Sequence, residues 1–208
     1  SRIAIVGTPC QIAASRRMQL SELTNRRLGE TIKLHIGLFC MHAFEYEKFF
    51  RGVIEKQTRT PLSEVVKFDI KRGRFIIYRK QKPRRELACE AVEQYAGFPC
   101  TVCSDFAAEL ADISIGAEGS PLDRSTVLLR TPLRVEAFDI TMRFRKLNVT
   151  ELKDVKPGAV AIERASRDKK LKAAKQLELL QRQGKSLPVW KWERKATAGT
   201  LSQSSEGS

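Results

Sequence analysis

The 208-residue sequence contains no run of about 18 apolar residues, the length that a membrane-spanning helix needs. Its first residues lack the apolar stretch and small-residue cleavage site of a signal peptide. Histidine is scarce, with two residues, and no Ser-His-Asp set or carboxylate pair has the spacing of a hydrolase site. These absences argue against a membrane protein, an exported protein and a hydrolase, and we expect a cytoplasmic protein.

Cysteine occurs in an odd number, five, which does not suit a framework of disulfides. In a cytoplasmic chain thiols stay reduced, and closely spaced pairs usually serve metal or redox chemistry. Cys100 and Cys103 form such a pair, directly after the helix-stopping sequence Gly97-Phe98-Pro99. Because a C-x-x-C turn serves zinc and iron–sulfur clusters alike, the spacing alone leaves both open.

The formal net charge of +14 favours an anionic partner, which is a nucleic acid, a phosphorylated cofactor or an acidic protein surface. RNA-binding sheets carry exposed aromatic residues among basic ones. The phenylalanines here fall instead in apolar patterns, as at Phe39, Phe49, Phe68 and Phe75. We therefore expect no nucleic-acid partner.

Apolar runs followed by helical patterns predict parallel strand–helix units in the first part of the chain. A short strand at 3–6 precedes a turn and a helix, and a buried run at 31–40 precedes a helix at about 45–56. The core stripe of the second helix is expected at Phe49, Val53 and Ile54.

The following part predicts antiparallel strands and helices. Strands at 65–70 and 75–78 flank a turn with Gly73, a helix is expected at 85–95, and two more strands are expected at 113–116 and 125–131. A helix around 135–146 follows. The predicted fold is mixed α/β, bordering α+β, with parallel βαβ units, an antiparallel hairpin and a C-terminal basic helix.

Composition predicts three regions. Residues 1–162 form the expected core domain, 163–196 a basic helical extension with few apolar positions, and 197–208 a Ser/Gly-rich disordered tail. The chain opens without Met, directly on an apparent strand, so it is interpreted as the C-terminal part of a longer domain.

Topology predicts that more cysteines join the C-x-x-C pair. Cys10 follows the first strand and Cys40 ends the second, and the carboxyl ends of parallel strands open on one edge of a sheet. A loop with Cys100 and Cys103 that closes over this edge gives four thiolates. The alternative for Cys10 and Cys40 is a small buried apolar role.

The remaining cysteine and the two histidines are weaker candidates for a metal or cofactor site. Cys89 lies in a helical pattern and is interpreted as packing. His35 is expected to be structural or exposed, and His42 is a weak candidate for lining a cofactor site because it is close to Cys40.

Three blocks of the sequence resemble a known family: GTPCQIAA at 7–14, IGLFC at 36–40 and CTVCSDFAAELADIS at 100–114. In this order and at these separations they are similar to the beta subunit of coenzyme F420-reducing hydrogenases and related dehydrogenase subunits. The resemblance covers most of residues 2 to about 185. Three ordered blocks are far more specific than one C-x-x-C pair.

The resemblance implies an iron–sulfur flavoprotein subunit that transfers electrons between coenzyme F420 and the redox centres of other hydrogenase or dehydrogenase subunits. It implies a 4Fe-4S cluster at Cys10, Cys40, Cys100 and Cys103. It also implies FAD, with contacts expected at Gly7, Thr8, Gln11, Ser125 and Thr126.

Several alternatives stay open. Asp105, Glu109 and Asp112 either serve solubility and helix capping or orient the cluster loop. For the whole chain, one alternative is a non-enzymatic basic domain with a structural zinc at the same cysteines, binding RNA or a partner protein. Another is a truncated remnant that folds without turning over substrate.

Overall fold

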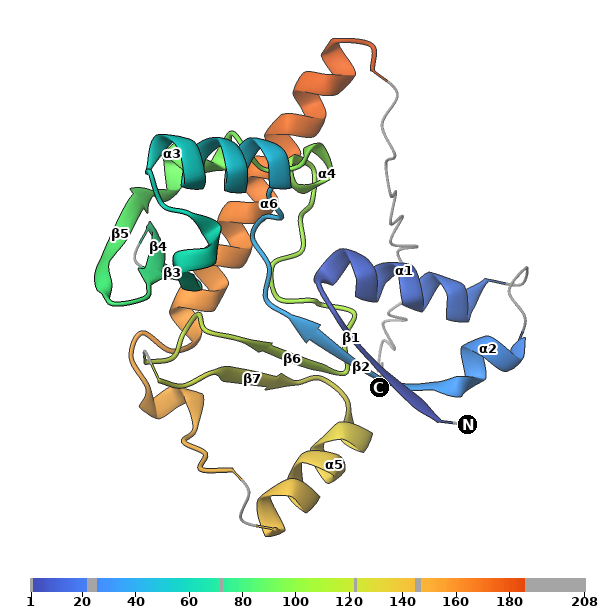
Figure 1. The fold of residues 1–208 in the computed structure, drawn as a ribbon. Coiled ribbons are helices and arrows are strands. Elements are labelled where there is room, and N and C mark those ends of the chain that lie inside the picture. Colours follow the sequence, from blue (N-terminus) through green and yellow to red (C-terminus); the bar gives the residue numbers. More distant parts are fainter. Residues whose placement is uncertain (1, 22–25, 72, 122, 145–146, 186–208) are drawn as a thin grey trace, which may run out of the picture.

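A computed structural model describes residues 2–21, 26–71, 73–121, 123–144 and 147–185. It contains two sheets and the helices that surround them (Figure 1). Parallel and antiparallel strands occur together, so the predicted mixed α/β class is confirmed. The predicted tail at 197–208 and residues 186–196 of the predicted extension lie outside the described residues.

The four-stranded sheet has the strand order β1-β2-β6-β7. Its strands are β1 (Ile3–Gly7), β2 (Ile32–Leu38), β6 (Ile113–Gly116) and β7 (Thr126–Leu129). The first three are parallel and β7 is antiparallel to β6, so the carboxyl ends of β1, β2 and β6 lie at one edge. Helices α1 (Pro9–Leu20) and α2 (Arg26–Thr31) connect β1 to β2, which confirms the predicted parallel unit.

The three-stranded sheet is antiparallel and consists of β3 (Val65–Lys71), β4 (Arg74–Arg79) and β5 (Lys82–Ala88). Gly73 turns the predicted β3–β4 hairpin with a positive φ of 71°. The π-helix η1 (Tyr46–Gln57) and the 3-10 turn η2 (Leu62–Glu64) precede this sheet. Phe49, Val53 and Ile54 of η1 are buried with Phe75, Ile77 and Val92, so the predicted core stripe is confirmed.

The helix predicted at 85–95 is wrong in its first half. Residues through Ala88 belong to β5, and the helix α3 spans only Cys89–Glu93. Leu87 pairs with Phe75 of β4 and packs against the core around it. The spacing of Leu87 and the apolar residues after Cys89 suggested one helix face, but the charged residues of β5 lie on an exposed edge strand, where long polar side chains stay in water.

The later helices are α4 (Phe98–Thr101), α5 (Pro132–Arg143) and α6 (Ala159–Arg182), with a 3-10 turn η3 (Leu152–Asp154) before α6. In Figure 1, α6 is the long orange helix that runs from the β6–β7 hairpin past α4. It buries one stripe, at Ala161, Ile162, Lys169, Ala173 and Leu180. The predicted boundary between residues 162 and 163 falls inside this helix.

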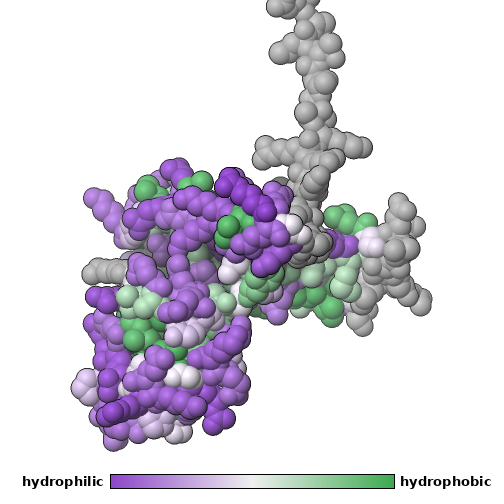
Figure 2. Space-filling model, turned by 90° about the horizontal axis from the view of Figure 1, so that it is seen from above, coloured by the Kyte–Doolittle hydropathy of each residue, from purple (hydrophilic) through white to green (hydrophobic). Residues whose placement is uncertain are grey.

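The surface is mostly hydrophilic on the face shown in Figure 2, with scattered hydrophobic patches. Within the described residues, we find no helix with the length and apolar character needed to cross a bilayer.

Candidate metal centre

Cys10 lies at the start of α1, directly after β1. Thr8 caps the helix, and its backbone N–H and its hydroxyl both donate to Gln11 Oε1, at 2.8 and 3.1 Å. Gly7 leaves room for this folded glutamine, because a Cβ there would lie 2.9 Å from Gln11 Oε1. The exposed Cys10 therefore sits on the first turn of a helix, with its Sγ 3.2 Å from Thr8 Oγ1.

Cys40 follows β2 and is tied to two other segments. Its N–H donates to Phe106 O at 2.9 Å, which joins it to the loop after Cys103. Its own carbonyl accepts a hydrogen bond of 2.6 Å from Lys169 Nζ of α6. The same ammonium donates to Asp105 O at 2.8 Å, so Lys169 holds the Cys40 segment and the Cys103 loop together.

The C-x-x-C pair begins in α4 and not wholly in a loop as predicted. Cys100 is in this single helical turn, where its N–H donates to Gly97 O, and Cys103 follows it. The Ala43 N–H donates to Cys100 Sγ at 3.2 Å, and Gly97 N–H donates to Ala43 O at 2.9 Å. The chain that leaves β2 is thus bound to the turn that carries the pair.

The pKa of the Cys40 thiol depends on burial and on charged or ionisable groups around it. Burial raises the pKa of the Cys40 thiol, and the nearby Lys169 charge opposes this rise. Cys100, Cys10 and Cys103, in their ionised forms, would each raise the same pKa further. Cys89 is not among these neighbours; burial and the carboxylates of Glu90 and Glu93 raise its pKa.

The thiols of Cys100 and Cys103 each form a hydrogen bond with a nearby backbone group. Cys103 Sγ donates to Asp105 O at 3.7 Å, and Cys100 Sγ accepts from the Ala43 N–H. Within the part of the chain that the structure describes, no three His, Cys, Asp or Glu side chains are already grouped around one point as metal ligands. The ligand set of Cys10, Cys40, Cys100 and Cys103 remains a prediction.

The acidic residues after the pair have different environments. Both carboxylate oxygens of Asp105 accept the Glu109 N–H, and burial raises the pKa of Asp105. Glu109 is exposed and pairs with Lys170. Asp112 is buried, accepts the His35 N–H at 2.8 Å and pairs with Arg16 at 2.9 Å. Asp105 therefore shapes the cysteine loop, whereas Asp112 fixes β2 against the start of β6.

The residues predicted to contact FAD lie at the same edge of the sheet in two groups. Gly7, Thr8 and Gln11 are at the end of β1, and Thr126 pairs with Gly116 at the end of β6. Ser125 is exposed, just before β7. Thr126 is buried and donates to Glu118 O, with Ser120 Oγ 2.6 Å away, so its hydroxyl holds the preceding loop.

The histidines differ in burial. His35 is fully buried, with its Nε2 2.8 Å from Ser15 Oγ, in agreement with a structural role. His42 lines a pocket of about 370 Å³ together with Cys100, Cys103, Lys169 and Lys172. Burial lowers the pKa of His42.

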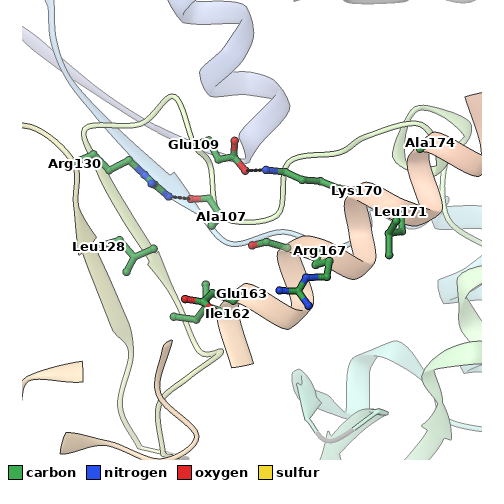
Figure 3. Close-up of a pocket in the computed structure, with 11 residues that line it drawn as sticks. Ala107, Glu109, Leu128, Arg130, Ile162, Glu163, Arg167, Lys170, Leu171 and Ala174 are labelled. Carbon is green, nitrogen blue, oxygen red and sulfur yellow. Dashed lines mark hydrogen bonds and ion pairs between the residues drawn. The ribbon is translucent and has the colours of Figure 1, made fainter. Parts of the chain in front are cut away.

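A second, larger hollow lies across α6 from this pocket (Figure 3). It has a volume of about 1010 Å³ and an apolar floor that includes Leu128 and Ile162. Arg130, Arg167 and Lys170 bring positive charge to it, and Lys170 pairs there with Glu109. None of the five predicted FAD contacts lines either pocket.

Lys169 is the site residue that the sequence analysis missed. The helix around it is rich in lysine and arginine, which suggested a solvated face. The signal lies in the spacing, because Lys169 stands between Ile162 and Ala173 on the buried stripe, a position that otherwise calls for an apolar residue.

Comparison with known proteins identifies the family of the chain. Residues 1–155 match the family model that describes the C terminus of the beta subunit of coenzyme F420 hydrogenase/dehydrogenase. The chain belongs to this family. The resemblance expected from the three sequence blocks is therefore confirmed for the F420 hydrogenase/dehydrogenase beta subunits.

Relatives within the family include the coenzyme F420 hydrogenase subunit beta of Methanococcus voltae, 34% identical over 188 residues, which are 90% of this chain and 65% of that protein. A subunit of the F(420)H(2) dehydrogenase of Methanosarcina mazei is 31% identical over 157 residues, 76% of this chain and 42% of that protein. The chain thus spans less than two thirds of the length of these F420 proteins.

A solved structure of the same family has the same fold. A chain of the xenon-derivatised F420-reducing [NiFe] hydrogenase complex from Methanosarcina barkeri superposes with a TM-score of 0.84 at 29% identity. The match covers 89% of this chain and 64% of that one.

Proposed function

We propose that this chain is the C-terminal electron-transfer part of a coenzyme F420-dependent oxidoreductase subunit. In this proposal it passes electrons between F420 and the redox centre of a partner hydrogenase or dehydrogenase subunit, through FAD and a 4Fe-4S cluster. The observation that carries the proposal is that hydrogen bonds tie the Cys40 segment to the loops of Cys100 and Cys103, while Cys10 follows the neighbouring parallel strand.

The donor set fits an iron–sulfur cluster. Four cysteine thiolates are the usual ligands of a 4Fe-4S cluster, and the same set also binds zinc. Zinc has no redox chemistry, whereas the relatives are named as hydrogenase and dehydrogenase subunits. The family membership therefore supports iron over zinc.

The hydrogen bonds and aromatic side chains around the cysteines suit such a cluster. The Ala43 N–H donates to Cys100 Sγ, and Thr8 Oγ1 lies beside Cys10 Sγ. Hydrogen bonds to cysteine sulfur are one way in which proteins set the reduction potential of a cluster. Phe39, which precedes Cys40, packs against Phe106 with ring centroids 5.3 Å apart. When bound, the cluster supplies one-electron transfer and FAD supplies the step between a hydride and single electrons.

The FAD contacts at Gly7, Thr8, Gln11, Ser125 and Thr126 are part of the proposal. Their support is their common position at the carboxyl edge of the parallel strands, where ligands of such sheets bind. Backbone groups are the stronger candidates at Thr126, because its hydroxyl is already engaged with Glu118 and Ser120. The positive charge of the chain suits the phosphates and carboxylates of FAD and F420.

Metal analysis of protein purified without oxygen tests the proposal. About four irons and four sulfides per chain, with visible absorption that bleaches on reduction, are expected. Titration with FAD and with F420, followed by fluorescence, then tests the two organic ligands. One zinc per chain and a colourless protein that cannot be reconstituted with iron would overturn the electron-transfer function.

A further inference from the structure

Lys169 is a lysine in a place where lysines are rarely found. Its exposed fraction is 4%, and among the buried polar side chains of the described residues it is the one lysine or arginine. Removal of an ammonium group from water costs several kcal/mol unless an opposite charge compensates it. The structure should therefore contain a negative group that balances this charge.

In the part of the chain that the structure describes, no carboxylate forms a direct ion pair with Lys169, whose charge acts on the Asp105 carboxylate only without such contact. Lys169 Nζ donates hydrogen bonds to two backbone carbonyls, those of Cys40 and Asp105. The Asp105 carboxylate turns to the Glu109 N–H instead. The neighbouring Lys170 and Lys172 are exposed and do pair with carboxylates, those of Glu109 and Glu93.

The cysteines are the groups near Lys169 that would become anionic on binding a metal. One of its acceptors is the carbonyl of Cys40, and the other lies two residues after Cys103. Its pocket neighbours include Cys100 and Cys103 themselves. The ammonium thus lies between the two loops that bring three of the four predicted ligands.

We propose that Lys169 is a positioning residue that supplies the buried positive charge for the thiolate-bound cluster and raises the reduction potential of that cluster. This inference rests on the proposed function. A cluster gains one negative charge when it is reduced, and a fixed positive charge in a poorly hydrated site stabilises the reduced form more than the oxidised form. The two carbonyl hydrogen bonds hold the ammonium in place for this effect.

Replacement of Lys169 separates the charge from its structural role. Lys169→Met keeps the length and apolar stem of the side chain but removes the charge, and Lys169→Arg keeps the charge. Arg164→Met is the matched control, because it removes one positive charge from an exposed position on α6 outside both pockets. The potential of each reconstituted protein is measured by a redox titration followed by visible absorption and electron paramagnetic resonance.

We expect Lys169→Met to lower the equilibrium constant for one-electron reduction at least tenfold, which is a shift of about 59 mV to lower potential. Lys169→Arg should stay within about threefold of the parent chain, and Arg164→Met within about twofold, since exposed charges are screened. A Lys169→Met protein with full iron content and the parent potential would overturn the inference and leave the proposed function intact.

Loss of the cluster in Lys169→Met does not end the test, because Lys169→Gln then takes its place. Glutamine retains an N–H donor for the carbonyls and carries no charge. A low potential in Lys169→Gln supports the charge role, and the parent potential contradicts it. If the parent chain itself takes up no iron, both this inference and the proposed function fail.

Discussion

The backbone N–H of Ala43 donates to the sulfur of Cys100 at 3.2 Å, although 57 residues separate the two in the sequence. This contact connects the segment that leaves β2 with the turn that carries the C-x-x-C pair. The carbonyl of Ala43 completes the connection by accepting from the Gly97 N–H. The pair is therefore held over the edge of the sheet by backbone groups, independently of the side chains at 41–43.

Single serine replacements should distinguish the four predicted ligand cysteines from Cys89, which is not a predicted ligand. Each of the variants Cys10→Ser, Cys40→Ser, Cys100→Ser and Cys103→Ser is expected to lose most of its iron or to hold an altered cluster, because a hydroxyl is a poor ligand for iron in such clusters. Cys89→Ser should keep the iron content of the parent chain, since Cys89 is not among the groups that act on Cys40. Iron per chain and the visible spectrum after reconstitution are the measurements; loss of iron in Cys89→Ser alone would refute the assignment.

Gly37 should not tolerate substitution by a residue with a side chain, because β2 packs directly on the cysteine loop at this point. A Cβ on Gly37 would overlap the Cβ atoms of Ala108 and Ala111, which are both buried. We expect Gly37→Ala to lower the free energy of unfolding by about 1–3 kcal/mol, the usual cost of overpacking a core. Gly52→Ala in η1 is the control, since its nearest contact is 3.4 Å and alanine favours a helix, so its stability should stay equal or rise. Urea unfolding measures both, and equal midpoints for the two variants would contradict the packing argument.

Local patterns in the sequence reveal some features of this fold and miss others. Phe49, Val53 and Ile54 were predicted as a core stripe because they belong to one helix with its own periodicity. The parallel pairing of β1 and β2, on which the predicted approach of Cys10 to Cys40 rests, followed from the strand–helix pattern. Strand β5 was missed because its Lys, Arg and Glu residues face solvent, and only its pairing with β4 makes it a strand.

Lys169 was missed for a related reason. A lysine is usually exposed, and a helix with so many basic residues fits a solvated face. Its burial depends on the fold, which places α6 across the carbonyls of Cys40 and Asp105. A single polar residue on an otherwise apolar helical stripe is the pattern that would have revealed it.

Asp112 should contribute more to stability than the other acidic residues of its block. It is 5% exposed, accepts the His35 N–H and pairs with Arg16. Asp112→Ala is expected to lower the free energy of unfolding by about 2–4 kcal/mol, because it leaves a buried donor and a partly buried guanidinium without their acceptor. Glu109→Ala, which removes an exposed ion pair with Lys170, should cost about 0–1 kcal/mol. A loss in Glu109→Ala as large as that in Asp112→Ala, measured by urea unfolding, would show that burial does not determine the difference.

Cys89 offers a test of the local electrostatics that does not depend on a bound metal. Burial, Glu90 and Glu93 raise the pKa of its thiol, so at pH about 8 a smaller share of it is thiolate than in an ordinary cysteine, and alkylation should be slow. Glu90→Gln removes a negative charge and should lower this pKa, which increases the thiolate share and raises the alkylation rate at pH about 8 by roughly two- to threefold. At a strongly alkaline pH, above this raised pKa, the thiol is ionised in both proteins, and the difference should largely disappear. The rate is read from the peptide containing Cys89 by mass spectrometry after timed exposure to iodoacetamide. An increase of the same size at both pH values would mean that the substitution improves access to Cys89 and leaves its pKa unchanged.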